Sequence, residues 1–231
     1  MATPGDVIGY LDLCREEGAS LQRGMNFRLR SGVSVVLMSR RSGAPYDDVM
    51  LEDEKVLIYE GHDEPRRRGG PEPKNADQPT ESPSGKKTQN GLFFDAALRF
   101  RRGEGEPELV RVYEKIRTGI WVYNGTFSLV DAWKEQSGSR IVFKFKLELT
   151  SEGLSAEKLD EFPLAHTRLI PSPVKQEVWK RDKGRCVLCH KTDNLHFDHD
   201  LPFSKGGTSI TAANIRLLCA RHNLQKRDKI E

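Results

Sequence analysis

The chain has 231 residues, of which 36% are hydrophobic and 31% charged, and its formal net charge is +3. This composition is typical of a globular protein in water, and no stretch approaches the roughly 18 uncharged apolar residues that a bilayer-spanning helix needs. Residues 1–18 lack the basic start and apolar stretch of an export signal, so we expect a cytoplasmic protein with no membrane partner.

Charge and cysteine are unevenly distributed along the chain. Residues 166–231 contain 13 Lys/Arg and 7 Asp/Glu, whereas residues 1–165 contain 24 Lys/Arg and 27 Asp/Glu. A positive excess confined to the last part of the chain is expected of a surface that binds phosphate. Three of the four cysteines also lie in this part, which favours metal binding over the disulfide framework of a secreted protein.

The first 150 residues predict mostly β-structure. Residues 5–17 predict a short helix, and a polar stretch at 62–90, rich in Pro, Gly, Lys and Glu, predicts a long loop. Runs of β-branched and aliphatic residues between turn residues predict five strands, at 32–39, 55–61, 109–116, 121–133 and 140–149. Together these elements predict a β-barrel or a strongly curved sheet with flanking helices.

A domain boundary is expected shortly after the last of these strands. Residues 151–163 predict a short helix, and prolines at 163, 171 and 173 indicate a linker of restricted flexibility. The part that follows is too short to bury a self-sufficient apolar core without a metal, a disulfide or a partner. We therefore expect an α+β protein with two domains, residues 1–162 and 174–231, joined by a linker at 163–173.

Two closely spaced pairs of metal-binding residues lie in the second part, Cys186-Val-Leu-Cys189 and Cys219-Ala-Arg-His222. A CxxC and a CxxH pair can together supply four ligands in a tetrahedron to one zinc ion, with no position left open for water. The spacing therefore predicts a structural zinc site. The alternative is three reduced thiols in a core and a histidine on the surface.

Between the two pairs, Asp198 and His199 are expected at the end of a strand, and a helix is expected to begin near Ala212 and to carry Asn223 beyond it. The order of Asp198-His199, a Lys-Gly-Gly loop at 205–207, Asn214 and Asn223 between and after the cysteine pairs resembles the HNH nucleases. The resemblance covers about residues 170–230 and implies their ββα-metal fold, a β-hairpin and a helix around one divalent ion. The alternative is a zinc ribbon that Asp198 and His199 merely decorate.

The HNH resemblance implies hydrolysis of a phosphodiester bond, with His199 as the general base because a neutral imidazole has the appropriate pKa. Asp198 and the amide oxygen of Asn223 would hold Mg²⁺ or Mn²⁺, which stabilises charge on the phosphate and the departing 3′ oxygen. Asn214 would bind backbone across the loop and fix His199. Asn223 stands where the family name has its second histidine, and an amide oxygen is also a ligand for Mg²⁺.

Two further features of this part have open interpretations. His196 precedes Asp198 by two residues on the same strand face and would either touch phosphate, assist the metal or be simply half-buried. The basic residues Lys226, Arg227 and Lys229 would form either a solvated face or a phosphate contact.

The first part contains a series of short motifs in a characteristic order: Tyr46-Asp47-Asp48-Val49, Tyr59-Glu60-Gly61, the loop Lys86 to Gly91, Val110-Arg111-Val112, and Tyr123-Asn124-Gly125. Their order and spacing over about residues 25–150 resemble the SRA (SET and RING associated) domains, which are readers of modified cytosine. The family has Tyr-Asp-Gly where this chain has Tyr-Asn-Gly, so Asn124 is a departure from its pattern.

The SRA resemblance implies that a modified cytosine is flipped out of the duplex into a pocket. The residues that it places in this pocket are Tyr46, Asp48, Tyr59, Gly61 and Thr88. The two tyrosines would stack on the base, and the carboxylate of Asp48 would accept a hydrogen bond from the cytosine N4 amino group, with Asp47 as the fallback. Gly61 would leave room for the 5-substituent. The alternative is two ordinary sheet tyrosines and an Asp-Asp turn.

Taken together, the two halves resemble the SRA-HNH modification-dependent restriction endonucleases, the TagI-like group. The resemblance implies a bacterial enzyme that cuts double-stranded DNA beside 5-methylcytosine or 5-hydroxymethylcytosine. Because one HNH centre cuts one strand, we expect a homodimer. The alternatives are a modified-DNA reader that does not cleave, and an HNH nickase whose first half is a nonspecific docking domain.

Overall fold

A computed structural model of the protein describes residues 2–51, 54–63, 66, 72–150, 169–201 and 207–226. The helix expected at 151–163, most of the Lys-Gly-Gly loop, and the basic residues Arg227 and Lys229 lie outside these ranges. Within the described ranges, no helix is long and apolar enough to cross a membrane.

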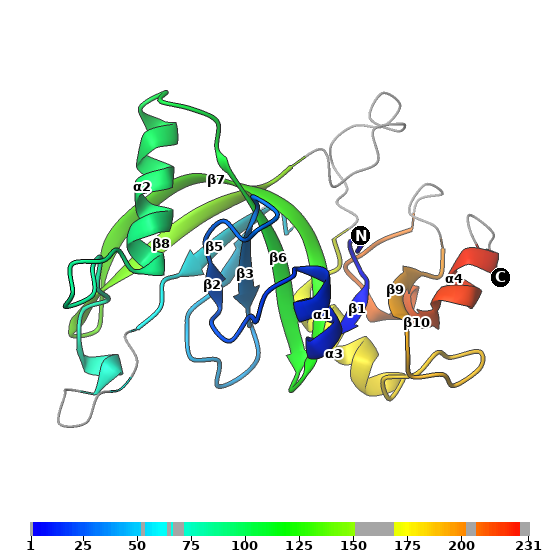
Figure 1. The fold of residues 1–231 in the computed structure, drawn as a ribbon. Helices are drawn as coiled ribbons and strands as arrows, with labels where there is room; N and C mark the ends of the chain where they lie inside the picture. Colours follow the sequence, from blue (N-terminus) through cyan, green and yellow to red (C-terminus); the bar gives the residue numbers. More distant parts are fainter. Residues whose placement is uncertain are drawn as a thin grey trace.

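A single curved sheet forms the larger part of the molecule (Figure 1). Seven strands follow one another in the order β2-β3-β6-β7-β8-β5-β4, and β1 pairs with β7. All neighbours are antiparallel except β3 and β6. The strands are β1 (Val7–Gly9), β2 (Met25–Asn26), β3 (Ser34–Met38), β4 (Val49–Leu51), β5 (Val56–Glu60), β6 (Glu108–Arg117), β7 (Ile120–Ser137) and β8 (Arg140–Leu149).

The five predicted strands are confirmed, and the curvature has a local cause. Register shifts interrupt the pairing of β6 with β7 at Val112/Tyr113 and that of β7 with β8 at Leu129/Asp131. Such bulges increase the local twist and bend a strand. The long strands β7 and β8 therefore arch across the molecule (Figure 1).

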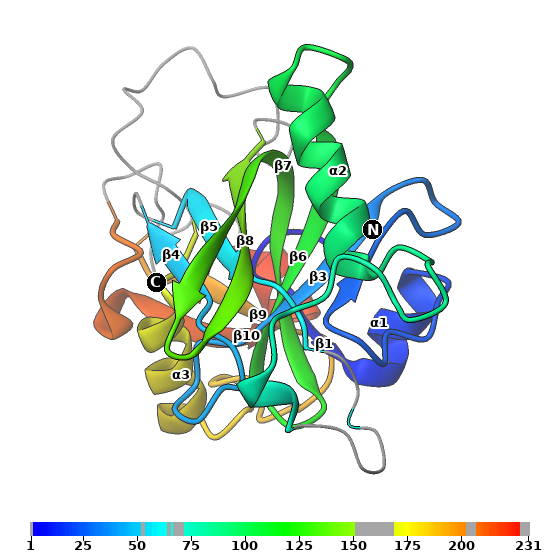
Figure 2. The same cartoon turned by 90° about the vertical axis from the view of Figure 1, so that its left-hand side faces the viewer.

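The helices of this half differ from expectation. Residues 7–9 pair with β7 as β1, so the first helix, α1, spans only Tyr10–Glu16. A short 3-10 helix, η1 (Pro73–Asn75), interrupts the polar stretch. The sequence analysis did not predict α2 (Gln89–Arg101), which packs on the sheet through the buried side chains of Phe93 and Ala97 (Figure 2).

The last part of the chain contains α3 (Ser172–Arg181), β9 (Leu195–His199), the 3-10 turn η5 (Ala212–Asn214), β10 (Ile215–Cys219) and α4 (Ala220–Lys226). The expected helix near Ala212 was wrong, because after one 3-10 turn the chain pairs with β9 as β10. Pro173 lies in the first turn of α3, where its missing N–H group costs nothing, so the last two prolines begin a helix.

The two parts share a hydrophobic core. Ile116 of β6 and Val122 of β7 belong to one buried cluster with Val178 of α3, Leu195 of β9 and Leu217 of β10. The short C-terminal part thus obtains from the sheet some of the apolar surface that it cannot supply itself. Figure 1 shows the β9-β10 hairpin beside β1, far from α2.

Candidate functional site

Cys186, Cys189, Cys219 and His222 form a compact cluster whose ligand atoms all lie within 4.8 Å of one another. The Sγ atoms of Cys189 and Cys219 are 3.7 Å apart, and His222 Nδ1 is 3.3 and 3.4 Å from the Sγ atoms of Cys186 and Cys219. The edges of a tetrahedron around zinc are about 3.8 Å between sulfurs and about 3.6 Å between sulfur and nitrogen. These four side chains therefore fit one tetrahedral metal ion.

The electrostatics of the cluster favour a thiolate. Burial would raise the pKa of the Cys186 thiol, but the backbone N–H groups of Cys219 and Cys189 and the ring of His222 lower that pKa to about 6. A thiolate is the form that binds metal.

Asp198 and His199 lie at the end of β9, as expected. The side-chain amide of Asn214 joins the two sides of the following loop: its Oδ1 accepts from Leu201 N at 2.8 Å, and its Nδ2 donates to Leu201 O and Thr208 O at 3.2 and 2.9 Å. His199 Nε2 lies 2.8 Å from the hydroxyl of Ser209, within the same loop. Asn214 and Ser209 thus hold the segment that carries His199.

Helix α4 brings the ammonium group of Lys226 to Asp198. Lys226 is only 2% exposed, its Nζ lies 2.5 Å from Asp198 Oδ2, and it also donates to the carbonyl oxygen of His199. Both interpretations of Lys226 from the sequence, a solvated face and a phosphate contact, were therefore wrong, because its side chain is buried and paired with Asp198. Asn223 lies three residues before Lys226, and residues at this spacing share one face of a helix. The face of α4 that contacts Asp198 is consequently the face that carries Asn223.

His196 contacts the first half of the chain. Its Nδ1 lies 2.6 Å from Asp6 Oδ1, the two residues form an antiparallel bridge, and Phe197 N donates to Gly5 O at 3.1 Å. Burial would raise the pKa of Asp6, but the hydrogen bonds from His196 and Thr3 lower it. His196 therefore joins the hairpin to the N-terminal strand.

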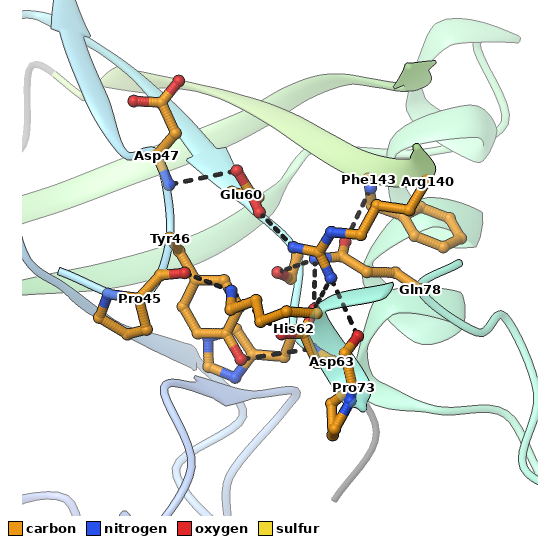
Figure 3. A network of polar contacts seen from close by, with 12 residues as sticks. Pro45, Tyr46, Asp47, Glu60, His62, Asp63, Pro73, Gln78, Arg140 and Phe143 are labelled. Atoms are coloured by element: carbon orange, nitrogen blue, oxygen red, sulfur yellow. Dashed lines mark hydrogen bonds and ion pairs between the residues drawn. The ribbon is translucent and has the colours of Figure 1, made fainter. Parts of the chain in front are cut away.

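In the first half, the two predicted tyrosines both contact His62, a residue that no sequence motif singled out. The rings of Tyr46 and His62 are stacked, with centroids 4.5 Å apart and planes at 8° (Figure 3). The ring of Tyr59 is 5.8 Å from that of His62, and its hydroxyl lies 2.8 Å from His62 Nε2. Tyr59 is 1% exposed, so its ring is not open to solvent as a stacking surface.

Asp48 is the buried carboxylate of the Asp-Asp pair. Its oxygens accept hydrogen bonds from Ser39 N at 3.0 Å and from Glu60 N at 3.2 Å. Burial raises the pKa of Asp48 to about 7, against the opposing effect of these two bonds. The side chain of Asp47, in contrast, is 81% exposed, and its Oδ2 lies 3.8 Å from Lys144 Nζ.

A network of buried charges lies beside these residues (Figure 3). Arg140 donates to Glu60 at 3.2 Å and to Asp63 at 2.5 Å, and Lys144 lies 3.2 Å from Glu60. Lys74 continues the network, because its Nζ lies 3.0 Å from Asp63 and 4.1 Å above the ring of Tyr46. Tyr46 is therefore held between an imidazole on one face and an ammonium group on the other.

A hollow of about 520 Å³ opens at this network, and its lining includes Tyr46, Asp48, Glu60, Lys74 and Arg140. This volume lies within the range of small-molecule sites. The structure thus brings Tyr46 and Asp48 together at one hollow, with positive side chains beside it.

Two of the expected pocket residues have other roles. A Cβ at Gly61 would lie 2.6 Å from Gln78 Oε1, 2.8 Å from Asn90 Oδ1 and 2.9 Å from Phe143 Cβ, so the room expected there is already filled. The hydroxyl of Thr88 accepts a hydrogen bond from Gly91 N at 3.2 Å and caps the N-terminus of α2. The expectation for Gly61 is corrected, since this glycine permits close packing. Thr88 begins a helix, and its place in the pocket stays a prediction.

The departure at Asn124 has a structural explanation. Its side chain is buried, its Nδ2 donates to Glu114 Oε2 at 3.2 Å, and its Oδ1 accepts from Lys175 Nζ at 2.7 Å. An amide can do both at once, whereas a carboxylate would put a second negative charge beside Glu114.

No protein family and no curated protein sequence matches this chain. Several solved structures are similar to it. The SUVH5 SRA domain in complex with methylated CHH DNA has a TM-score of 0.46 and 23% identity, over 64% of this chain and 89% of that chain. The same domain bound to fully hydroxymethylated CG DNA has a TM-score of 0.45 and 21% identity, over 65% and 89%. SUVH6 from Arabidopsis thaliana has a TM-score of 0.42 and 21% identity, over 64% of this chain and 26% of that chain.

Proposed function

We propose that the chain is a modification-dependent DNA endonuclease. Its curved-sheet half binds an extruded 5-methylcytosine or 5-hydroxymethylcytosine, and its C-terminal ββα unit hydrolyses a phosphodiester bond nearby. The observation that carries the proposal is the arrangement of β9, β10 and α4, which places Asp198, His199 and the loop held by Asn214 beside a four-ligand cluster.

The metal proposed for the four-ligand cluster is zinc. Three thiol groups and one imidazole are soft or borderline ligands, which zinc accepts in a closed tetrahedron. With four protein ligands and no place for water, the ion would be structural. It would hold the loop after α3 to the start of α4, through Cys189 and His222.

In the proposed hydrolysis, His199 accepts a proton from the attacking water. An imidazole is suited to this step because its ordinary pKa is near neutrality. The hydroxyl of Ser209 and the loop clasp of Asn214 fix the position of His199, so that the ring need not be ordered during the reaction.

Asp198 and Asn223 would hold the catalytic Mg²⁺ or Mn²⁺. The donor set fits, since carboxylate and amide oxygens are the ligands that these hard ions prefer. When bound, such an ion stabilises negative charge on the phosphate and the departing 3′ oxygen. Lys226 keeps one oxygen of Asp198 in place at 2.5 Å, which orients the carboxylate for this role.

The proposed binding of modified cytosine rests on Tyr46 and Asp48. An aromatic ring that is stacked face to face with a planar neighbour at 4.5 Å has the spacing that a nucleobase needs. The adjacent carboxyl group of Asp48 can accept a hydrogen bond from the N4 amino group of cytosine. The SUVH5 SRA domains were themselves crystallised with methylated and hydroxymethylated DNA.

In the proposed function the two halves have different tasks: the first recognises the modified base, and the second hydrolyses the backbone. Contacts to the DNA backbone carry little sequence information, so discrimination falls to the extruded base. One centre cuts one strand, and we propose that double-strand cleavage uses two copies of the chain.

A second candidate function is a reader of modified DNA that does not cleave. The ion pair of Lys226 with Asp198 favours it, because an ammonium group already neutralises the carboxylate that the catalytic ion would need.

One experiment tests both candidates. Methylated and unmethylated plasmids are incubated with the protein and Mg²⁺ or Mn²⁺, beside the variant His199→Ala. We expect cleavage of the methylated plasmid alone, and none by the variant, which still binds methylated DNA. Equal cleavage of both plasmids would refute the reading of modified cytosine. Binding of methylated DNA without any cleavage would establish the second candidate.

A further inference from the structure

His62 covers one face of Tyr46. The two rings are stacked with their planes at 8° (Figure 3). The hydroxyl of Tyr59 contacts the edge of the imidazole, 2.8 Å from Nε2. A planar nitrogen heterocycle is therefore already present where an extruded base would stack.

The position of His62 is built into the fold. Asn90, at the start of α2, accepts from the backbone N of His62 at 2.9 Å and donates to its carbonyl oxygen at 2.8 Å. Gly24 closes the edge of the ring, since a Cβ there would lie 2.3 Å from His62 Cε1 and 2.7 Å from Nε2. The segments that carry Gly24 and Asn90 thus hold His62 beside Tyr46.

The ring resembles a nucleobase in charge as well as in shape. Burial, together with the nearby charges of Lys74 and Arg23, lowers the pKa of His62 to about 4, against the opposing effect of Asp63. At neutral pH the imidazole is uncharged. A neutral, planar ring with a hydrogen-bonding nitrogen has the same requirements for its surroundings as cytosine has.

We propose that the base slot is the space against the face of Tyr46 on which His62 stacks, that His62 fills it in the DNA-free protein, and that His62 leaves it when a base enters. The inference rests on the proposed reading of modified cytosine.

A filled slot lowers the affinity for DNA. A base must replace one ring stack and one hydrogen bond before it gains its own, which corresponds to about a tenfold loss of affinity. Removing the imidazole should therefore tighten binding.

The test compares two variants of the full chain with the wild type. His62→Ala empties the slot, and His62→Phe keeps a flat ring in it. Binding to a duplex with one 5-methylcytosine, and to the unmodified duplex, is followed by fluorescence polarisation. We expect His62→Ala to bind the modified duplex about tenfold more tightly than the wild type, and His62→Phe to bind it no more tightly than the wild type.

The opposite order of affinities for the modified duplex would overturn the proposal. If His62 were a permanent wall on which the base stacks, His62→Phe would bind like the wild type and His62→Ala would bind more weakly. Equal affinities of all three proteins would also overturn it. Thermal melting and metal content verify that each variant is folded.

The design separates this proposal from the proposed function. If the wild type prefers the modified duplex and His62→Ala binds it no more tightly, only the filled slot is refuted. If the preference appears only in His62→Ala, the filled slot is supported. If no protein prefers the modified duplex, both proposals fall.

The departure of His62 can also be followed in the wild-type protein by the proton resonance of its ring. The ring of Tyr46 shifts the Cε1 proton resonance of His62, and this shift should disappear when the modified duplex is added. A resonance that stays unchanged at saturating modified DNA contradicts the departure of His62.

Discussion

Asp48 and Asp47 are neighbouring carboxylates that differ in burial, and we assign the contact with the base to the buried one, Asp48. Two backbone N–H groups hold its oxygens, and burial raises its pKa to about 7, so that both protonation states occur near neutral pH. In either state a carboxyl oxygen remains an acceptor for an amino group. Asp47 offers its carboxylate to solvent.

Substitution of each carboxylate separately tests this assignment. We expect Asp48→Ala to weaken binding of 5-methylcytosine DNA roughly tenfold, since one base contact is worth about 1–3 kcal/mol, while salt-sensitive backbone binding persists. The matched control Asp47→Ala should bind like the wild type. Polarisation titrations at two salt concentrations measure both. Loss of preference in Asp47→Ala alone would assign the base contact to the fallback residue.

Short motifs located some site residues in the sequence, whereas contacts between distant segments could not be predicted. The Cys-x-x-Cys and Cys-x-x-His spacings identified the metal cluster because each pair lies within one turn of chain. His62 escaped notice and Lys226 was misinterpreted because their contacts are with Tyr46 and Asp198, 16 and 28 residues away. The misinterpretation of Gly61 has the same cause, since Gln78, Asn90 and Phe143 fill its surroundings.

At the scale of elements, α3 connects the two halves. At its start, Ser172 accepts from Arg40, which lines the hollow at Tyr46, at 3.2 Å. At its end, Arg181 donates to the carbonyl oxygens of Ala212 and Ile215, each at 2.6 Å, on either side of Asn214. Between them, Lys175 forms a fully buried ion pair with Glu114 of β6 at 2.8 Å.

The buried ion pair of α3 predicts the effect of removing one partner. Lys175→Met would leave Glu114 charged and unpaired in the core, which costs about 3–5 kcal/mol of unfolding free energy. The double variant Lys175→Met/Glu114→Gln should recover part of this loss, because no charge remains buried. Denaturant unfolding measures both. A single variant as stable as the wild type would show that the pair does not hold α3.

Strands were predictable and helices less so. The strands follow from local apolar patterns, and pairing in the sheet reinforced each of them. Helix α2 was missed because Gly91 near its start disfavours a helix, and its buried face is defined only by the sheet beneath Phe93 and Ala97. The residues after Ala212 were taken for a helix because their pairing with the strand expected before His199 was not recognised.

At the scale of the whole molecule, the halves form one packed body in the described part of the chain. The cluster containing Ile116, Val122 and Leu217 crosses from the sheet to the β9-β10 hairpin. The hydrogen bond between Asp6 and His196, at 2.6 Å, joins the same two parts. A fixed arrangement would keep the distance from the bound base to the cut bond within narrow limits.

The shared core also predicts how the protein responds to loss of one ligand of the proposed zinc ion. Cys186→Ser removes one of four ligands, and the binding energy of a structural zinc, about 10–16 kcal/mol in small domains, is at the same time folding energy. Because Cys186 belongs to the cluster that includes Val122 of β7, we expect one cooperative transition for the whole chain, lower by more than about 10 °C. Calorimetry with metal analysis measures this, and Cys14→Ser, outside the cluster, is the control. Two separate transitions, with the sheet unaffected, would show that the halves fold independently despite their common core.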